Sequence, residues 1–337
     1  MKKKVLIGMS GGVDSSVAAY LLSKEYDVLG VTLLLHGNDD RDAKRVCERI
    51  GIDHISVNAE DAFKTHVIDN FTSEYRRART PNPCILCNEH IKFGTMLDLA
   101  DELGADFIAT GHYSRLVMQN GEFFPQRALF DEKDQTYALY RLSQKKLSRS
   151  LFPLGDLSKD EVRLLAREIG LEVADKADSQ DICFIPDGDY ASYIEERFGK
   201  ADPGRFRGPK GEDLGEHKGL IRYTVGQRRG LGIAYSERIF VSKLDPEKNE
   251  VILGLEGSQS KSEVSASDIN WISDKQPTGT FSCKGKIRYN SRVCDCVVKV
   301  FENRIVASFS EPQRGVSPGQ SLVLYDGERL IGGGFIE

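Results

Sequence analysis

The clearest indication of the fold of this 337-residue chain is the run Lys4-Val5-Leu6-Ile7-Gly8-Met9-Ser10-Gly11-Gly12-Val13-Asp14-Ser15. Residues 4–9 form an apolar segment of strand length, and residues 14–25 place their apolar side chains on one side of a helix. The two glycines between them let the backbone turn tightly around an anion, and the amino end of a helix favours phosphate. Asp14 could cap this helix or hold a magnesium ion that bridges two phosphates. The run predicts a phosphate-binding loop, although it matches neither the Walker pattern nor Gly-x-Gly-x-x-Gly.

Strands and helices alternate over the first half of the chain, which is typical of an α/β fold with a doubly wound parallel sheet. Further strands are expected at residues 28–35, 54–57 and 106–110. Further helices are expected at residues 39–51, 61–77, 89–103 and 158–169, the last with a capping box made by Ser158 and Glu161. Ligands of such sheets bind at the carboxyl ends of the strands, where the glycine loop lies. We expect this first domain to span residues 1–200.

The second half of the chain contains short alternating segments separated by turns, which predicts an all-β structure. Residues 203–211 are rich in glycine and proline and are expected to form a linker or a turn cluster. Strands are expected at residues 238–243, 250–253, 284–289, 297–301 and 321–325. We therefore expect a small β-rich central domain at residues 201–270 and a C-terminal β-barrel of six-stranded type at residues 271–337.

The charged residues are unevenly distributed along the chain. The net charge of −5 for the whole chain argues mildly against a nucleic-acid partner. Residues 151–196 hold 4 basic and 12 acidic side chains, whereas residues 197–230 hold 9 and 4, and residues 281–304 hold 6 and 2. The acidic segment therefore offsets two basic segments in the net charge of the whole chain. The basic segments form either ordinary solvated faces or sites for a polyanion.

The cysteine content and the hydropathy predict a cytoplasmic protein. No apolar run approaches the length of about 18 residues that a membrane helix needs, so no membrane span is expected. The apolar segment that follows Lys4 stops at Ser10, which is too short for a signal peptide. Seven cysteines are too few for a disulfide scaffold in a chain of this length, so we expect free thiols in a reducing compartment.

Three of the seven cysteines stand in segments that suggest chemistry. Cys84 and Cys87 form a Cys-x-x-Cys pair in a proline-bound loop before a helix, and the amino end of a helix lowers the pKa of a thiol. Cys183 stands in a separate segment, between Ile182 and Phe184. The other four cysteines lie among apolar residues and are expected to be structural: Cys47, Cys283, Cys294 and Cys296.

The loop at residues 10–15 resembles the pyrophosphate loop of the PP-loop ATP pyrophosphatases, which split ATP into AMP and pyrophosphate. Together with the cysteine segments, it makes the chain resemble one family of this group along essentially its whole length, the bacterial tRNA-specific 2-thiouridylases (MnmA). Seven ordered motifs carry this resemblance, and at compatible spacing they are highly specific. They are Gly8–Ser15, Asn82-Pro83-x-x-x-Cys87-Asn88 with Ile91-Lys92-Phe93, Ala109–Tyr113, Lys133–Tyr137, Ile182–Ile185, Tyr223–Gly230 and Ser317–Gln320.

The resemblance implies a PP-loop domain of the adenine nucleotide α-hydrolase-like type that uses ATP and Mg²⁺. It implies that ATP contacts Gly8, Met9, Ser10, Gly11, Gly12, Val13, Asp14, Ser15, Leu33 and Gly111. The wobble uridine of tRNAs for Lys, Glu and Gln would be flipped into the site, because its C2 atom is unreachable while stacked. Adenylation of the C2 oxygen and replacement of that oxygen by sulfur would then give 2-thiouridine.

The resemblance also implies roles for the cysteines and for tRNA-binding residues. Cys183 would carry a persulfide received from a sulfur relay protein or a cysteine desulfurase, and Cys87 would release the sulfur through a disulfide with Cys183. Cys84 and Asp14 complete the candidate catalytic set. The implied tRNA contacts are Asn82, Pro83, Cys84, His112, Lys133, Asp134, Gln135, Arg288, Tyr289 and Gln320. In the basic β half, Arg228 and Arg229 are the strongest candidates for the tRNA backbone, and such binding weakens as salt rises.

Cys84 departs from the family pattern, which often has Asp at this position. Three thiolates, Cys84, Cys87 and Cys183, could hold a [4Fe–4S] cluster with one iron left open. A cluster-free persulfide route is the second interpretation. The third is a zinc site with His90 as fourth ligand, although His90 also fits ordinary helix packing.

Other functions explain parts of the sequence. A PP-loop ligase or amidotransferase that makes a small metabolite would explain the loop at residues 10–15 but would leave Cys87 and Cys183 unused. An RNA-binding protein that uses ATP only as a conformational ligand is a non-enzymatic alternative. A tRNA thiolase that acts on another base is a nearer one, although the loop begins at residue 8 and leaves no room before it for an RNA-binding extension.

Overall fold

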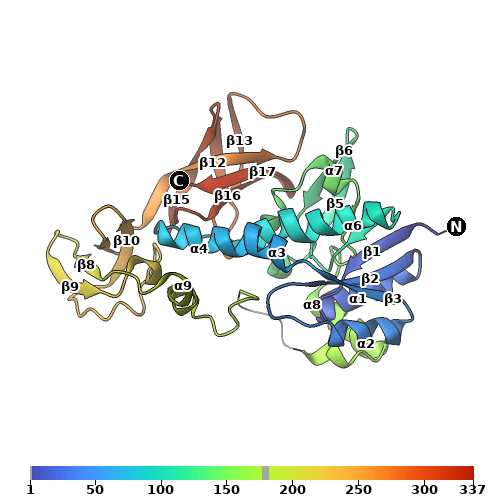
Figure 1. Cartoon of the computed structure of the whole chain (residues 1–337). Coiled ribbons are helices and arrows are strands. Elements are labelled where there is room, and N and C mark those ends of the chain that lie inside the picture. The colour runs from blue at the N-terminus through green and yellow to red at the C-terminus, as the bar shows by residue number, and fades with distance from the viewer. Residues whose placement is uncertain (1, 177–181) are drawn as a thin grey trace.

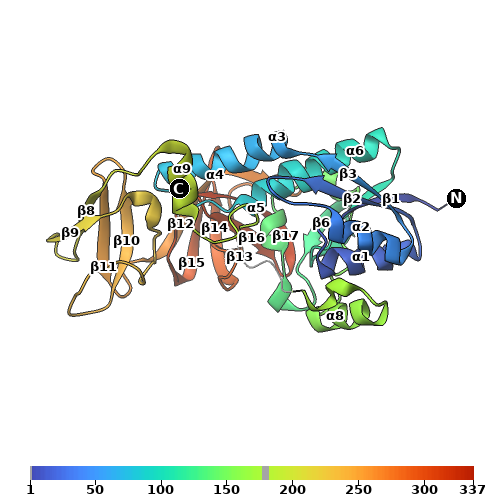
Figure 2. The ribbon, with the colours of Figure 1, turned by 60° about the horizontal axis from the view of Figure 1, so that its bottom comes forward.

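The computed structural model describes residues 2–176 and 182–337, and Figure 1 shows a parallel-sheet part, a small sheet and a barrel. Figure 2 shows the barrel strands between the small sheet and the parallel sheet. Across the described ranges, none of the helices combines the length and the hydropathy needed to cross a membrane.

The parallel sheet has the strand order β3-β2-β1-β4-β7, which confirms the predicted α/β class. Its central strand, β1, pairs with β2 on one side and with β4 on the other. The chain adds strands on one side of β1 up to β3 and then continues on the other side with β4, so the strand order reverses between β1 and β4. Such a switch point leaves a crevice at the carboxyl ends of the strands. The strands are β1 (Lys4–Gly8), β2 (Asp27–Leu34), β3 (Asp53–Asn58), β4 (Phe107–Ala109) and β7 (Ser150–Leu151).

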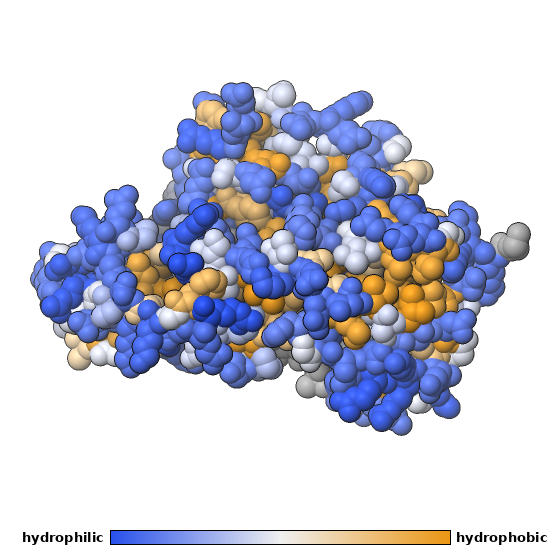
Figure 3. Space-filling view, viewed as in Figure 1, coloured by the Kyte–Doolittle hydropathy of each residue, from blue (hydrophilic) through white to orange (hydrophobic). Residues whose placement is uncertain are grey.

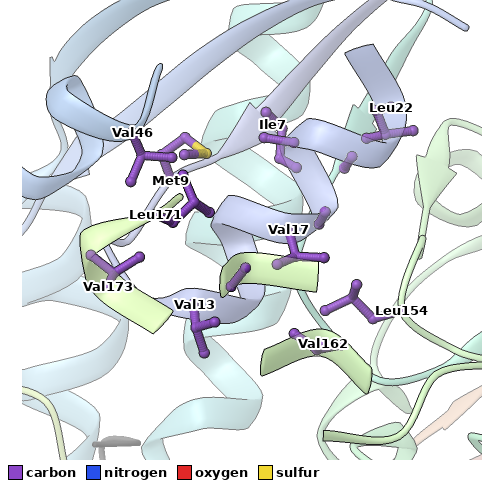
Figure 4. Packing of buried hydrophobic residues seen from close by; sticks show 14 of the residues in the cluster. Ile7, Met9, Val13, Val17, Leu22, Val46, Leu154, Val162, Leu171 and Val173 are labelled. Carbon is purple, nitrogen blue, oxygen red and sulfur yellow. The ribbon is translucent and has the colours of Figure 1, made fainter. Parts of the chain in front are cut away.

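Three helices cover one face of this sheet and form a core with β1. Figure 4 shows Val17 of the first of them close to Val162 of the third, with Ile7 of β1 in the same cluster. The third helix starts with the predicted capping box, in which Ser158 N donates to Glu161 Oε2 at 2.7 Å and Glu161 N donates to Ser158 Oγ at 3.3 Å. The helices are α1 (Val13–Ser23), α2 (Arg41–Ile50) and α8 (Lys159–Glu168).

Two helices that the sequence predicts as continuous contain π-helical segments. In a π-helix the hydrogen bond spans five residues instead of four, and such segments are rare and frequent at functional sites. The first helix consists of α3 (Glu60–Phe63), the π-helix η1 (Lys64–Ile68) and α4 (Asp69–Arg76). The second consists of α5 (Pro83–Leu86), the π-helix η2 (Cys87–Thr95) and α6 (Met96–Glu102).

The small sheet has the order β10-β11-β8-β9 and follows helix α9 (Tyr190–Phe198). The prediction of a linker or a turn cluster at residues 203–211 is wrong for residues 204–207, which form β8, whereas a turn does follow at residues 208–211. Phe206 of β8 is buried and pairs with Val251, so a hydrophobic anchor holds this glycine-rich segment in the sheet. The strands are β8 (Gly204–Arg207), β9 (Asp213–His217), β10 (Ile239–Asp245) and β11 (Glu250–Leu255).

Six strands of the described chain form the C-terminal barrel in the order β12-β15-β14-β13-β16-β17, closed by pairing of β12 with β17. A hairpin from the first half of the chain, β5 (Arg115–Gln119) and β6 (Glu122–Gln126), extends this sheet beside β17. The domain limits at residues 200 and 270 stay predictions. Along the chain, β11 is the last strand of the small sheet and β12 is the first strand of the barrel. The barrel strands are β12 (Ser260–Trp271), β13 (Thr280–Lys286), β14 (Cys294–Val300), β15 (Arg304–Arg314), β16 (Ser321–Asp326) and β17 (Arg329–Ile336).

The surface is mainly hydrophilic on the face drawn in Figure 3. Hydrophobic residues gather there over strands β1 to β3 of the parallel sheet. Leu33 of β2 and Val57 of β3 are only partly buried and pack against the cluster below them. The carboxyl end of β2 therefore offers apolar side chains beside the crevice.

Candidate active site

The predicted phosphate loop connects β1 to α1 and is held open by its own hydrogen bonds. Gly11 has φ +68°, a left-handed conformation that favours glycine. Ser15 Oγ donates to Gly12 O at 3.1 Å and accepts from Ser10 N at 3.3 Å. The backbone thus curves around a space in front of the first turn of α1, as binding of an anion requires.

Asp14 lies on the first turn of α1 and is not its N-cap, because the helix begins at Val13 after Gly12 and no side chain caps it. Lys159 Nζ of α8 lies 2.8 Å and 2.9 Å from the two carboxylate oxygens of Asp14. Tyr113 OH donates to Asp14 Oδ1 at 2.7 Å. Neither partner of Asp14 follows from the sequence, since both come from segments far from the loop.

The crevice beside the loop contains a cavity of about 250 Å³. Seven of the ten residues that the resemblance assigns to ATP border it, Leu33 and Gly111 among them, whereas Gly11, Gly12 and Val13 do not line it. A Cβ atom on Gly111 would lie 2.7 Å from Ser15 N and 2.9 Å from Asp14 C, so only glycine allows this close approach to α1. The lining residues are Gly8, Met9, Ser10, Asp14, Ser15, Val31, Leu33, Leu35, Asn38, Ile91, Lys92, Met96, Thr110, Gly111, His112 and Gln135.

His112 and Gln135, two predicted tRNA contacts, border the same cavity. His112 is buried, and its Nδ1 atom lies 2.7 Å from Thr110 Oγ1. Burial, assisted by the charge of Lys92, holds the pKa of His112 well below its usual 6.5, so the ring is neutral at pH 7. Gln135 Oε1 accepts from Tyr113 N at 3.0 Å, which leaves its amide NH₂ group as a donor.

Cys84 and Cys87 differ strongly in exposure, although only two residues separate them. Cys84 is exposed on the first turn of α5, whereas Cys87 is buried at the start of η2. Burial raises the pKa of Cys87 to about 12. The prediction that the position before a helix lowers the pKa is therefore wrong for Cys87, because burial of its thiol raises the pKa instead.

Cys183 lies next to Cys87 in the folded chain. The residues on either side of it, Ile182 and Phe184, pack in the same hydrophobic cluster as Cys87. The Phe184 ring centroid lies 5.3 Å from that of Phe71, which anchors the segment on α4. Cys183 itself keeps an exposed surface, yet the surrounding groups cover its thiol enough to raise its pKa.

The cysteines are not arranged as metal ligands. Among residues 2–176 and 182–337, no group of three or more His, Cys, Asp or Glu side chains is placed to hold a metal ion. This finding covers the expected [4Fe–4S] set and the zinc set with His90. Cys84 is exposed, whereas Cys87 is buried in the apolar cluster. His90 stacks on His66 with ring centroids 4.3 Å apart, which fits its interpretation as a packing residue.

The loop that carries Cys84 is attached to the barrel. Thr80 N donates to Pro318 O at 2.7 Å, and Gln320 Nε2 donates to Thr80 O at 2.7 Å. Asn82 caps α5, since its Oδ1 atom accepts from Cys84 N at 3.1 Å, and Pro83 takes the first helical position. The predicted tRNA contacts Asn82, Pro83 and Gln320 thus also position the cysteine loop.

The remaining predicted tRNA contacts fall into buried and exposed groups. Asp134 is buried and accepts from Thr136 Oγ1 and from Ala128 N, and Arg288 donates to Gly315 O and to Val225 O. Both side chains hold the fold together, and contact with tRNA stays a prediction for each. Lys133, which has a partner of its own, is half-buried, and Tyr289, Arg228 and Arg229 are exposed.

The fold and the crevice define a class of protein, the PP-loop nucleotide-binding α/β proteins. The family models that match are the tRNA methyl transferase HUP domain at residues 3–187, the tRNA methyl transferase PRC-barrel domain at 191–255 and the aminomethyltransferase β-barrel domain at 261–336. The chain belongs to the family of tRNA-specific 2-thiouridylases (MnmA).

Curated relatives named tRNA-specific 2-thiouridylase MnmA match over the whole chain. The protein of Clostridium acetobutylicum is 46% identical over 100% of both chains. Those of Clostridium perfringens and Clostridioides difficile are 44% identical over 100% of this chain and 99% of each relative. An NMN synthetase from Francisella tularensis has a TM-score of 0.35, with 18% identity over 53% of this chain and 67% of that chain.

Proposed function

We propose that this protein is an ATP-dependent tRNA 2-thiouridylase that acts on the wobble uridine of tRNAs for Lys, Glu and Gln. The observation that carries the proposal is the meeting of the phosphate loop with the helix of Cys87 at one cavity, since η2 contributes Ile91 and Lys92 to its wall. The names of the relatives support sulfur transfer rather than methyl transfer. A small-metabolite ligase would need the loop but neither cysteine.

The first step is adenylation of the base. The C2 oxygen of the flipped uridine attacks the α-phosphorus of ATP, and the bond to the bridging oxygen breaks, so that pyrophosphate leaves. Backbone N–H groups of the loop and the start of α1 bind the phosphates. Mg²⁺ would accompany ATP, and Asp14 is the one carboxylate among the described residues of the cavity wall.

The second step is transfer of sulfur. The terminal sulfur of a Cys183 persulfide attacks C2, and the C2–O bond breaks with AMP as the leaving group. The thiolate of Cys87 then attacks Cys183 Sγ, so that a Cys87–Cys183 disulfide forms and the sulfur stays on C2. An external thiol must reduce this disulfide, and a sulfur relay protein or a cysteine desulfurase must supply the persulfide.

The proposed route has no iron–sulfur cluster, because the three cysteines are not grouped as ligands. Anaerobic purification followed by iron and sulfide analysis tests this part, together with the variant Cys84→Asp. Full thiolation by iron-free protein agrees with the route, whereas activity that depends on stoichiometric iron contradicts it. All seven cysteines are free, which fits work in the reducing cytoplasm.

The test of the function is nucleoside analysis of tRNA after incubation with ATP and a persulfide donor. Wild-type protein should form 2-thiouridine and release pyrophosphate only when tRNA is present. Cys183→Ser should lose at least about a hundredfold in thiolation, because the nucleophile is absent, while adenylation continues. Cys47→Ser, at a structural cysteine, is the control.

Three results would contradict the proposal. Unchanged sulfur content with Cys183→Ser would favour a protein that only binds RNA. Pyrophosphate release that depends on a small acid would favour a metabolite ligase, and sulfur on another base would favour a different tRNA thiolase.

A further inference from the structure

Lys92 stands where the nucleotide cavity and the cysteine helix meet. It belongs to η2 and borders the cavity together with Ser10, Ser15 and Gly111 of the phosphate site. Its side chain is half-buried, and across residues 2–176 and 182–337 it makes no hydrogen bond or ion pair. A half-buried ammonium group beside an anion site is costly unless a ligand satisfies it.

The π-helix explains why Lys92 reaches this place. Cys87 and Lys92 are five residues apart, and the i to i+5 repeat of a π-helix brings such residues closer to one face than an α-helix does. An α-helix over residues 87–95 would turn Lys92 further from Cys87. The π-helix therefore carries Cys87 and a cation that borders the cavity.

Lys92 is also the only cation among the described residues that line the cavity, because His112 is neutral. The positive charge of Lys92 acts on the pKa of Cys87, Cys183 and His112, three groups from three separate segments. Two other described lysines lie near the loop, and both have partners: Lys159 pairs with Asp14, and Lys176 pairs with Asp42 and donates to Gly11 O. ATP carries about four negative charges, and Lys92 is the side chain of the cavity wall that can neutralise charge on the phosphates near the cysteines.

We propose that Lys92 is a catalytic residue that binds the α-phosphate of ATP and of the adenylated uridine. During adenylation, charge builds on the oxygens of the α-phosphorus as the uridine oxygen bonds and pyrophosphate leaves. During sulfur transfer, the same phosphate departs as AMP when the C2–O bond breaks. A fixed cation stabilises both transition states without a proton transfer. This inference rests on the function proposed above.

Binding measurements test the contact apart from the reaction. Lys92→Gln should weaken AMP binding about tenfold, the usual effect of one charge-assisted hydrogen bond, and leave adenosine binding unchanged, because adenosine lacks the phosphate. Lys92→Arg should retain most AMP affinity. Lys145→Gln, at an exposed lysine of α7 (Gln144–Leu147), is the matched control. Equal losses for AMP and adenosine, or no loss for AMP, would overturn the proposal.

Kinetic measurements then separate this inference from the proposed function. Lys92→Gln should lower kcat for tRNA-dependent pyrophosphate release about a hundredfold and change KM for ATP much less. Lys92→Met, of similar length, should behave like Lys92→Gln if the charge is what matters. Wild-type kcat in both variants would overturn the role of Lys92 alone. Absence of pyrophosphate release in the wild-type protein would instead overturn the proposed function.

Discussion

At the scale of single residues, the nucleotide site depends on close approach of two backbones. Gly111 lies after β4 and touches the first turn of α1, where a Cβ atom would come within 2.7 Å of Ser15 N. The atoms in the way belong to the backbone, so no side chain can move aside. Gly111 therefore sets the distance between the loop and the strand that borders the cavity.

Gly111→Ala should weaken ATP binding about tenfold or more, because α1 must shift away from β4 and the loop loses its geometry. Calorimetry or a fluorescent ATP analogue measures the affinity, and a melting curve checks that the fold persists. Wild-type ATP affinity in Gly111→Ala would show that the two backbones can separate without disturbing the loop.

At the scale of elements, helix α8 packs beside α1 and contacts the residue Asp14 that follows the phosphate loop. The capping box of Ser158 and Glu161 fixes the first turn of α8. Lys159, which follows Ser158, pairs with Asp14. Hydrogen bonds from Ser158 N and Oγ lower the pKa of Glu161 below its usual 4.5. Since the folded pKa is the lower one, the stabilisation by Glu161 is complete above pH 4.5 and is lost as the pH falls through the folded pKa.

Ser158→Ala should destabilise the first turn of α8 by about 1 kcal/mol, the usual cost of losing an N-cap. Hydrogen exchange of the Glu161 amide, which donates to Ser158 Oγ, measures this locally. Glu161→Gln preserves the reciprocal bond and serves as the control. In the wild-type protein the protection of the residue 161 amide should be constant above about pH 5 and fall in acid. The same fall in the Glu161→Gln variant would show that the carboxyl group of Glu161 does not cause it.

At the scale of the whole molecule, the barrel joins the active site to the small sheet. Arg288 of the segment after β13 donates to Val225 O, while Gln320 holds Thr80 of the cysteine loop. Arg228 and Arg229, in the Tyr223–Gly230 motif, are exposed near the same junction. A tRNA bound across the small sheet and the barrel would therefore reach the cavity from the side of the cysteines.

The double variant Arg228→Ala and Arg229→Ala should bind tRNA more weakly and keep wild-type ATP affinity. If each arginine neutralises one phosphate, the slope of log affinity against log salt should decrease by about 2. Filter binding at several salt concentrations measures both quantities. Arg45→Ala, an exposed arginine on α2, is the control. Unchanged tRNA affinity and slope in the double variant would place the tRNA backbone elsewhere.

The sequence alone was sufficient for features that depend on neighbouring residues. The strand–loop–helix around Gly11, the capping box at Ser158 and the alternation of the parallel sheet follow from local periodicity and turn chemistry. The motifs also led to the family. These features are determined locally because each rests on contacts within a few residues along the chain.

Only the tertiary structure decided the features that depend on burial and on distant partners. The raised pKa of Cys87, the pairing of Asp14 with Lys159 and the place of Lys92 on the cavity wall all arise from segments that the fold brings together. Phe206 likewise anchors a strand in a segment whose composition indicates a turn. Desolvation and Coulomb interactions depend on distance in space, and a pattern along the chain does not contain that distance.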